Sequence, residues 1–220
     1  MDTKIHIKKV IDLINKFKIN KPVIYFGLVF IFVFSFLMIS LYPMIETHSK
    51  INSYPAKREI ENNVNNKFGS SKQSRFEFNE KTNELVLYTI YYDKTNPDGT
   101  LIQKAITINM FNESFAPIIF LISLFLSTPL PIKQKLYRLL IALFFLEIYI
   151  MFKIYAIYFD NYNFPEFELV HFEGIWSLII YYYIKLLKTF GSGINYIIVS
   201  VIWLIFSGIT NLLLEKNVFK

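Results

Sequence analysis

Two charged residues, Glu147 and Lys153, interrupt the apolar run that follows Arg138 within residues 136–159. Glu147 lies near the middle of this stretch, and Lys153 follows six residues later. A carboxylate inside a bilayer costs about 2.5–3.5 kcal/mol on insertion scales, so Glu147 is a candidate proton carrier or general base. The alternative role is structural, with Glu147 protonated or hydrogen-bonded across a helix interface. The sequence alone leaves both roles open.

Lys153 is not placed to neutralise Glu147 within the same helix. Six residues turn a helix to a position about 120° away, whereas side chains meet at spacings of three or four. We therefore expect the long side chain of Lys153 to extend outward and reach the membrane surface with its ammonium group.

Small polar residues follow one face of the last apolar segment. Ser200, Ser207 and Asn211 fall within about 40° of one another on a helical wheel. Ser123 and Ser127 form a similar ridge in an earlier apolar segment. Such faces let helices approach closely and exchange hydrogen bonds, so we interpret them as packing surfaces in preference to a ligand site.

Other kinds of chemistry find little support in the residue types. The chain has no cysteine, which excludes disulfides, thiolate metal sites and a cysteine nucleophile. Its three histidines, His6, His48 and His171, lie far apart. We interpret the acidic loop around His171 (Glu166, Glu168 and Glu173) as solvated, with a cation site as the alternative. No phosphate-binding glycine loop, nucleophile elbow or zinc-hydrolase helix is present, so we expect no cofactor, no bound metal and no catalytic residue.

The elements that carry these residues are those of a membrane protein. Hydrophobic residues make up 54% of the 220 residues, above the roughly 45–50% of soluble domains. Residues 1–21 predict a basic amphipathic helix on the cytoplasmic membrane surface, an interpretation we prefer to nucleic-acid binding. Residues 22–45 predict the first transmembrane helix, and the preceding lysines place the N-terminus in the cytoplasm.

Residues 46–113 predict a small extracytoplasmic domain. A polar helix around Ala56–Phe68 precedes three β-rich runs, Arg75–Phe78, Leu85–Tyr92 and Leu101–Asn109. Asn96-Pro97-Asp98-Gly99 is a strong turn signal, because proline presets φ and glycine accepts positive φ. We therefore expect a three-stranded antiparallel meander that is marginally stable alone and leans on the membrane, its own helices or a partner.

Residues 114–220 predict four further transmembrane helices, giving an all-helical membrane part with five spans. They cover about 115–130, 136–159, 170–190 and 194–214, with a tight hairpin at Gly191-Ser192-Gly193. Lys185 and Lys188 interrupt the third of these four. The alternative is four spans in total and an interfacial helix at 165–188, which moves the C-terminus to the cytoplasm.

One part of the chain is similar to a known family. Ile106–Asn109 followed by Phe115–Pro129 (FAPIIFLISLFLSTP) resembles the exosortase-associated membrane proteins of type H sorting systems. In that family a β-rich outer segment ends in an Asn-containing junction, here Asn109. An apolar helix then closes on a small-Thr-Pro turn, here Thr128 and Pro129, before a basic cluster.

The resemblance implies a multi-pass protein of the bacterial inner membrane that accompanies a membrane-embedded sorting protease and has no chemistry of its own. Since exosortases carry a catalytic cysteine, this chain is not that protease. Our leading hypothesis is therefore a non-catalytic accessory protein whose partners are the lipid bilayer and another integral membrane protein. The main alternative is a small transporter or membrane enzyme that uses Glu147. A membrane sensor is a third hypothesis, disfavoured by the lack of a sizeable cytoplasmic domain.

Overall fold

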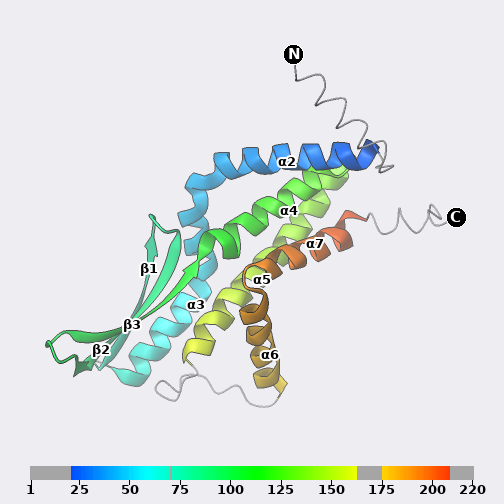
Figure 1. Ribbon diagram of the computed structural model, residues 1–220. Helices are drawn as coiled ribbons and strands as arrows, with labels where there is room; N and C mark the ends of the chain where they lie inside the picture. The colour runs from blue at the N-terminus through cyan, green and yellow to red at the C-terminus, as the bar shows by residue number, and fades with distance from the viewer. Residues whose placement is uncertain (1–20, 70, 163–174, 209–220) are drawn as a thin grey trace.

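The computed structural model describes residues 21–69, 71–162 and 175–208 (Figure 1). Residues 1–20 of the predicted basic helix (1–21), the acidic loop with His171, and Asn211 lie outside these residues. The elements in chain order are α2 (Lys21–Leu41), η1 (Tyr42–Met44), α3 (Ile45–Phe68), β1 (Lys72–Asn79), β2 (Glu84–Thr95), β3 (Leu101–Asn109), the π-helix η2 (Phe111–Phe115), α4 (Ala116–Ser127), α5 (Ile132–Tyr162), α6 (Ile175–Phe190) and α7 (Gly193–Ser207).

The class of protein follows from the length and composition of the helices. Of the described residues, two helical stretches are long and apolar enough to cross a membrane, Val23–Asn62 and Ile132–Tyr158. The bent pair α6 and α7 makes a third if it is taken as one span, and Phe111–Ser127 is a shorter apolar helix. The chain is therefore a mainly helical protein of the membrane type with a small sheet.

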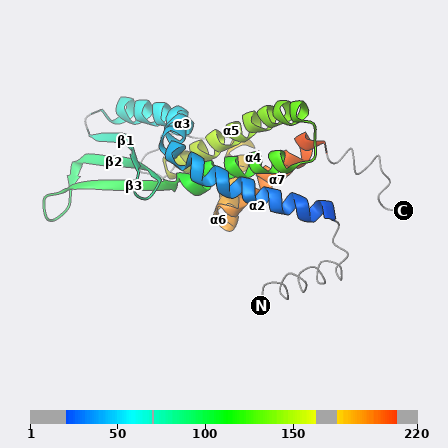
Figure 2. The same ribbon diagram turned by 90° about the horizontal axis from the view of Figure 1, so that it is seen from above.

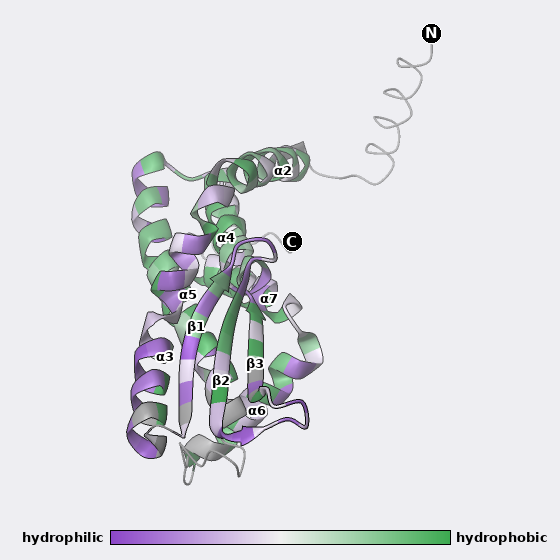
Figure 3. Ribbon diagram, turned by 90° about the vertical axis from the view of Figure 1, so that its left-hand side faces the viewer, coloured by the Kyte–Doolittle hydropathy of each residue, from purple (hydrophilic) through white to green (hydrophobic). Residues whose placement is uncertain are grey.

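Helices α2, α4, α5 and α7 run alongside one another, with α3 and the sheet at one end (Figure 2). In Figure 3 helix α3 is mostly hydrophilic and α2 is mostly hydrophobic, whereas the strands carry both kinds of residue. We call the end of the helices nearest the sheet the sheet end. The opposite end, where Thr128–Pro131 joins α4 to α5, is the turn end.

The turn from α2 into α3 has a local cause. The chain passes through the short 3-10 helix η1, which has Pro43 in its first positions. Proline has no N–H to donate to the carbonyl four residues earlier, so a regular α-helix cannot continue unchanged. The bend directs the polar α3 away from α2 and along the sheet (Figure 1).

The sheet is the predicted three-stranded antiparallel meander, with strand order β1-β2-β3. Phe76 pairs with Leu87, and Leu87 pairs with Ile106, so one row of apolar side chains faces α3. The first connection contains Asn83 at φ 54° and the second Gly99 at φ 81°, two residue types that tolerate the left-handed region. The turn signal at residues 96–99 is confirmed.

The sheet, α3 and the second half of α5 share one hydrophobic core. Its buried members include Ile60 of α3, Leu87 of β2, and Ile150 and Ile154 of α5. Tyr158 of α5 packs edge-on against Phe76, with ring centroids 4.9 Å apart. The second half of α5 therefore supports the polar domain while it also contacts α7. Ile132–Tyr158 is long and apolar enough to cross a membrane, which agrees with the span expected at residues 136–159. The expectation that the meander leans on the chain's own helices is confirmed.

The connection between α6 and α7 differs from the predicted hairpin. The two helices meet at an angle of 109°, whereas a tight hairpin between successive spans requires them to be nearly antiparallel. Gly191 at φ 55° makes the sharp change of direction possible. Helix α7 then runs within the bundle against α4 and α5, while α6 points away from it (Figures 1 and 2).

Candidate functional site

The polar side chains of the bundle gather around η2, the π-helix between β3 and α4. Its formation follows from Pro117, which has no N–H to bond the carbonyl of Glu113. The N–H of Ala116 instead reaches back five residues to the carbonyl of Phe111, and the N–H of Asn112 donates to Asn109 Oδ1 at 3.1 Å. Single π-turns of this kind frequently mark functional sites. Here the turn directs Glu113 and Ser114 into two separate polar groups.

The first group joins η2 to α5 and α7. The ammonium of Lys153 forms an ion pair with the carboxylate of Glu113, and it donates to Asn195 Oδ1 at 2.6 Å. Asn195 Nδ2 donates to Glu113 Oε2 at 2.9 Å and to the carbonyl of Asn112 at 3.1 Å. Tyr149 donates its hydroxyl to Asn195 Oδ1 at 3.2 Å. The first amino-terminal turn of α7 is thereby fixed to η2.

Lys153 corrects a sequence-based expectation. Its side chain is only 2% exposed and does not extend outward. An isolated buried ammonium is very costly, and it is retained because Glu113 supplies the opposite charge and Asn195 a second acceptor. Sequence reasoning missed Glu113 and Asn195. Residues 112–114 lie between the two segments that resemble the sorting-system family, but nothing in the local sequence linked Glu113 to Lys153.

The second group joins η2 to α3 and α5 through His48. Ser114 Oγ lies 2.9 Å from His48 Nδ1, and Glu147 Oε1 lies 3.0 Å from His48 Nε2. Asn52, one turn along α3, places its Nδ2 2.9 Å from the same Nε2. Glu147 is therefore hydrogen-bonded across a helix interface, the structural role that the sequence left open. As the spacing predicted, Glu147 and Lys153 have different partners.

Glu147 was expected near the middle of a transmembrane helix, but the structure places it at one end of the bundle. Although it lies in the middle of α5, its partner His48 belongs to the first turns of the polar α3. Glu147 thus lies at the sheet end of the bundle, where the second half of α5 begins to pack on α3 and the sheet.

Ser114, His48 and Glu147 are hydrogen-bonded in the same sequence as the nucleophile, base and acid of a catalytic triad. In hydrolases a histidine removes the serine proton and an acid on the other ring nitrogen stabilises the imidazolium. Here Ser114 is fully buried, and it does not line the three hollows that lie along α3 and the strands. Asn52 Oδ1 is buried beside them without a hydrogen-bond partner. In the observed conformation the three side chains connect η2, α3 and α5.

The other predicted residues lie along α7 and at the turn end. Thr128 is fully buried; it donates to the carbonyl of Leu124 at 2.7 Å and accepts from Trp203 Nε1 at 3.0 Å, which joins α4 to α7. Pro129 follows on the surface. Ser200 donates to the carbonyl of Tyr196 in its own helix, and Ser207 is buried and donates to that of Leu204. The structure does not bring Ser200 or Ser207 to η2.

Basic residues at the turn end cap two helices. Lys135 Nζ donates to the carbonyl of Leu126 at 2.8 Å, in the last turn of α4. Arg138 donates to the carbonyl of Ser207, the last residue of α7. Cations at helix C-termini satisfy free carbonyls and interact favourably with the helix dipole. The sequence showed a basic cluster after Pro129 but gave no sign of this capping role.

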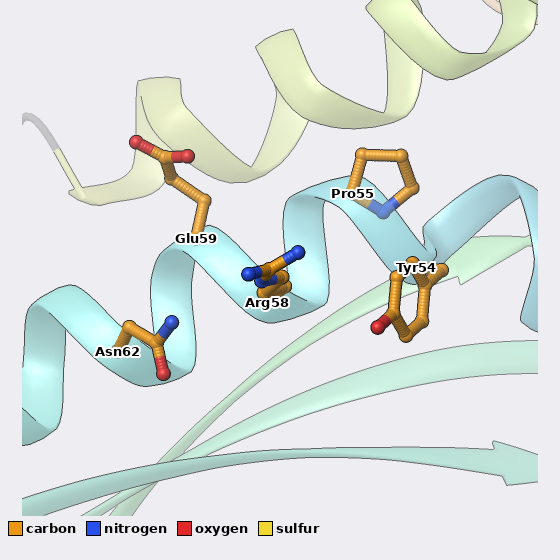
Figure 4. A pocket seen from close by; sticks show the side chains of 5 residues that line it. All are labelled: Tyr54, Pro55, Arg58, Glu59 and Asn62. Carbon is orange, nitrogen blue, oxygen red and sulfur yellow. The ribbon is translucent and has the colours of Figure 1, made fainter.

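A shallow hollow of about 560 Å³ lies on the exposed side of α3, and no residue of η2 lines it. Tyr54, Pro55, Arg58, Glu59 and Asn62 line it. Figure 4 shows Glu59 and Pro55 on the side of α3 that faces α5, and Tyr54 on the side of the strands. Within residues 21–69, 71–162 and 175–208, no group of three or more acidic, histidine or cysteine side chains is placed to hold a metal ion.

Comparison with protein-family models, curated proteins and solved structures finds no match to this chain. The site therefore has to be interpreted from its own geometry.

Proposed function

We propose that the chain is a non-catalytic integral membrane accessory protein that associates with a membrane-embedded sorting or processing protease of the exosortase type. In this proposal it resides in the bacterial inner membrane, with its N-terminus in the cytoplasm and residues 46–113 outside. The proposal combines the resemblance of residues 106–129 with the way the structure uses its polar residues.

The observation that carries the proposal is that the buried polar side chains are used to fix the sheet and α3 onto the helices. Glu113 with Lys153, and His48 with Glu147 and Ser114, hold η2, α3, α5 and α7 in one arrangement. A rigidly mounted surface is what recognition requires, because less conformational entropy is lost on binding. The exposed side of α3 offers Tyr54 and Arg58, residue types that are enriched in protein interfaces.

The proposed topology has four crossings. They are α2, η2 with α4, the first half of α5, and α7, with the turn end in the cytoplasm. Support comes from α7, whose first turn contacts Glu113 at the sheet end and whose last residue contacts Arg138 at the turn end. The C-terminus is then cytoplasmic, as in the four-span alternative that the sequence analysis left open. Lys135 and Arg138 at the turn end agree with the preference for positive charge on the cytoplasmic side.

Purification of the tagged chain from its native membranes in mild detergent, with mass spectrometry of what is retained, tests the association. We expect a multi-span protease with a catalytic cysteine in a stoichiometric amount. Recovery of the chain alone, or only with further copies of itself, would contradict the proposal.

A second candidate function is a membrane enzyme or transporter that uses Glu147, and the geometry of Ser114, His48 and Glu147 is the observation in its favour. If α3 moved away from η2, His48 could take the Ser114 proton while Glu147 stabilised the imidazolium. A fluorophosphonate probe that labels the wild-type chain and not the Ser114→Ala variant would support this candidate. Equal labelling of the two, or none, would count against a serine nucleophile.

A further inference from the structure

Helix α6 is nearly perpendicular to the direction in which the bundle runs. It meets α7 at 109°, and α7 packs lengthwise against α4 and α5. The junction between α6 and α7 is at the sheet end, because Asn195 in the first turn of α7 contacts Glu113 of η2. If α7 crosses a bilayer, α6 therefore lies close to the plane of that bilayer, at the level of its outer boundary.

The surface of α6 is apolar over most of its circumference. Its inner side contributes Ile184 and Leu187 to a small core with Ala156 of α5 and Ile194 of α7. Large apolar side chains are exposed on the remaining sides: Ile175, Leu178, Ile179, Tyr181, Tyr182, Leu186 and Phe190. Transfer of apolar surface out of water is favourable, so a medium other than water is expected around this helix.

The charged side chains of α6 lie in its last turns. Lys185, Lys188 and Thr189 are exposed there, next to the junction with α7. A lysine can bury its methylene chain along apolar neighbours while its ammonium reaches the phosphate groups of lipids. Tyrosines such as Tyr181 and Tyr182, with an apolar ring and a polar hydroxyl, are enriched at the same depth of a membrane.

We propose that α6 is an interfacial helix embedded in the outer leaflet, with acyl chains covering its exposed apolar side chains and lipid phosphates contacting Lys185 and Lys188. Its exposed apolar surface continues onto Ile197, Val201 and Ile205 of α7, which face outward from the bundle. A docked protein helix buries a limited stripe, whereas lipid covers apolar surface on several sides at once. The observations therefore favour lipid over a second copy or a partner protein. The inference depends on the proposed topology but not on the proposed protease partner.

Single-cysteine variants test the side of the membrane, and the chain has no native cysteine to remove. Intact cells producing Lys185→Cys are treated with a membrane-impermeant maleimide. Asn96→Cys, in the exposed β2–β3 connection, and Lys133→Cys, at the turn end, are the two references. We expect Lys185→Cys to react like Asn96→Cys. Reaction only after the membrane is opened, as expected for Lys133→Cys, would mean that α6 crosses the bilayer and would overturn the inference.

Nitroxide labels measure the depth of α6 in vesicles of defined phospholipid composition. Labels at Leu178→Cys and Tyr182→Cys should be accessible to oxygen and should lie at similar depths, roughly 5–10 Å below the phosphates. A label at Val201→Cys in α7 should lie deeper. Labels at Leu178 and Tyr182 that are accessible to a water-soluble nickel complex, or shielded from both reagents by protein, would overturn the inference. Because neither readout needs a partner, failure here is distinct from failure of the protease proposal.

Discussion

The carboxylate of Glu113 and the ammonium of Lys153 form an ion pair between η2 and α5, across 40 residues of sequence. Asn195 of α7 bonds to both of them, so three separate elements meet at one charged contact. The contact lies where the apolar bundle ends and the polar domain begins. Its disruption should therefore affect both parts of the protein.

Replacement of Lys153 by methionine tests this contact. The variant leaves the Glu113 carboxylate without its cation, and loss of one partner of a buried pair costs about 3 kcal/mol of unfolding free energy. Unfolding in mixed detergent micelles measures the change. Lys50→Met, which removes an exposed pair with Glu46, is the matched control and should change stability little. Adding Glu113→Gln to Lys153→Met should restore part of the loss; no restoration would contradict the pairing.

Replacement of Glu147 by glutamine separates the two proposed functions. The amide retains a hydrogen-bond acceptor for His48, so we expect a loss of only about 1 kcal/mol in stability and unchanged recovery of the partner. Immunoblotting and the native purification described above measure the two quantities. Normal amounts of the variant with complete loss of cellular function would instead favour an enzyme or transporter.

The hollow on α3 predicts a partner-contacting surface. Arg58→Glu reverses a charge at its centre, in a side chain that is exposed, and should reduce the recovered partner strongly without changing the amount of the chain. Lys81→Glu, in the exposed connection between β1 and β2, makes the same charge change elsewhere and should leave recovery unchanged. If the two variants behave alike, α3 is not the contact surface.

Gly208 should tolerate substitution poorly. It adopts φ 71°, and a Cβ at this position would collide with the guanidinium of Arg138, which caps α7. Gly208→Ala should therefore lower stability by about 1–3 kcal/mol, the usual cost of backbone strain. Gly27→Ala is the matched control, since nothing lies within 4 Å of its added methyl group. There we expect a gain of about 0.5–1 kcal/mol from helix propensity. Thermal unfolding in detergent distinguishes the two.

The β2–β3 connection should loosen in acid. Hydrogen bonds from the Thr100 hydroxyl and backbone N–H to the carboxylate hold the pKa of Asp98 below its usual value of 3.8. Because the folded pKa is depressed, the stabilisation is present above the unfolded value and is lost as the pH falls through the folded one. The Thr100 amide resonance should therefore shift only below about pH 4. In Asp98→Ala this shift should be absent; its persistence would assign it to another group.

The local elements of the fold were predictable, and the long-range contacts of the site were not. Pro97 and Gly99 determine a turn within four residues, and alternating apolar side chains determine the strands beside it. Lys153 has no such local signal, because its partners are 40 and 42 residues away. The apolar run of α6 predicted a helix but carried no information on its angle to α7. Glu147 was identified as a candidate from its unusual surroundings, whereas its partner His48, 99 residues away, was not.

Helix η2 joins β3 directly to α4 without a flexible loop, so it fixes which side of α4 faces the sheet. Each residue added to or removed from a helix turns everything beyond it by about 100°. A one-residue deletion in η2 would therefore turn α4 relative to the sheet and give Ser114 the direction that Glu113 now has. Insertions that the β2–β3 connection accepts without effect should be intolerable at η2. Across homologous chains of varying length, this junction is where we expect the spacing to be constant.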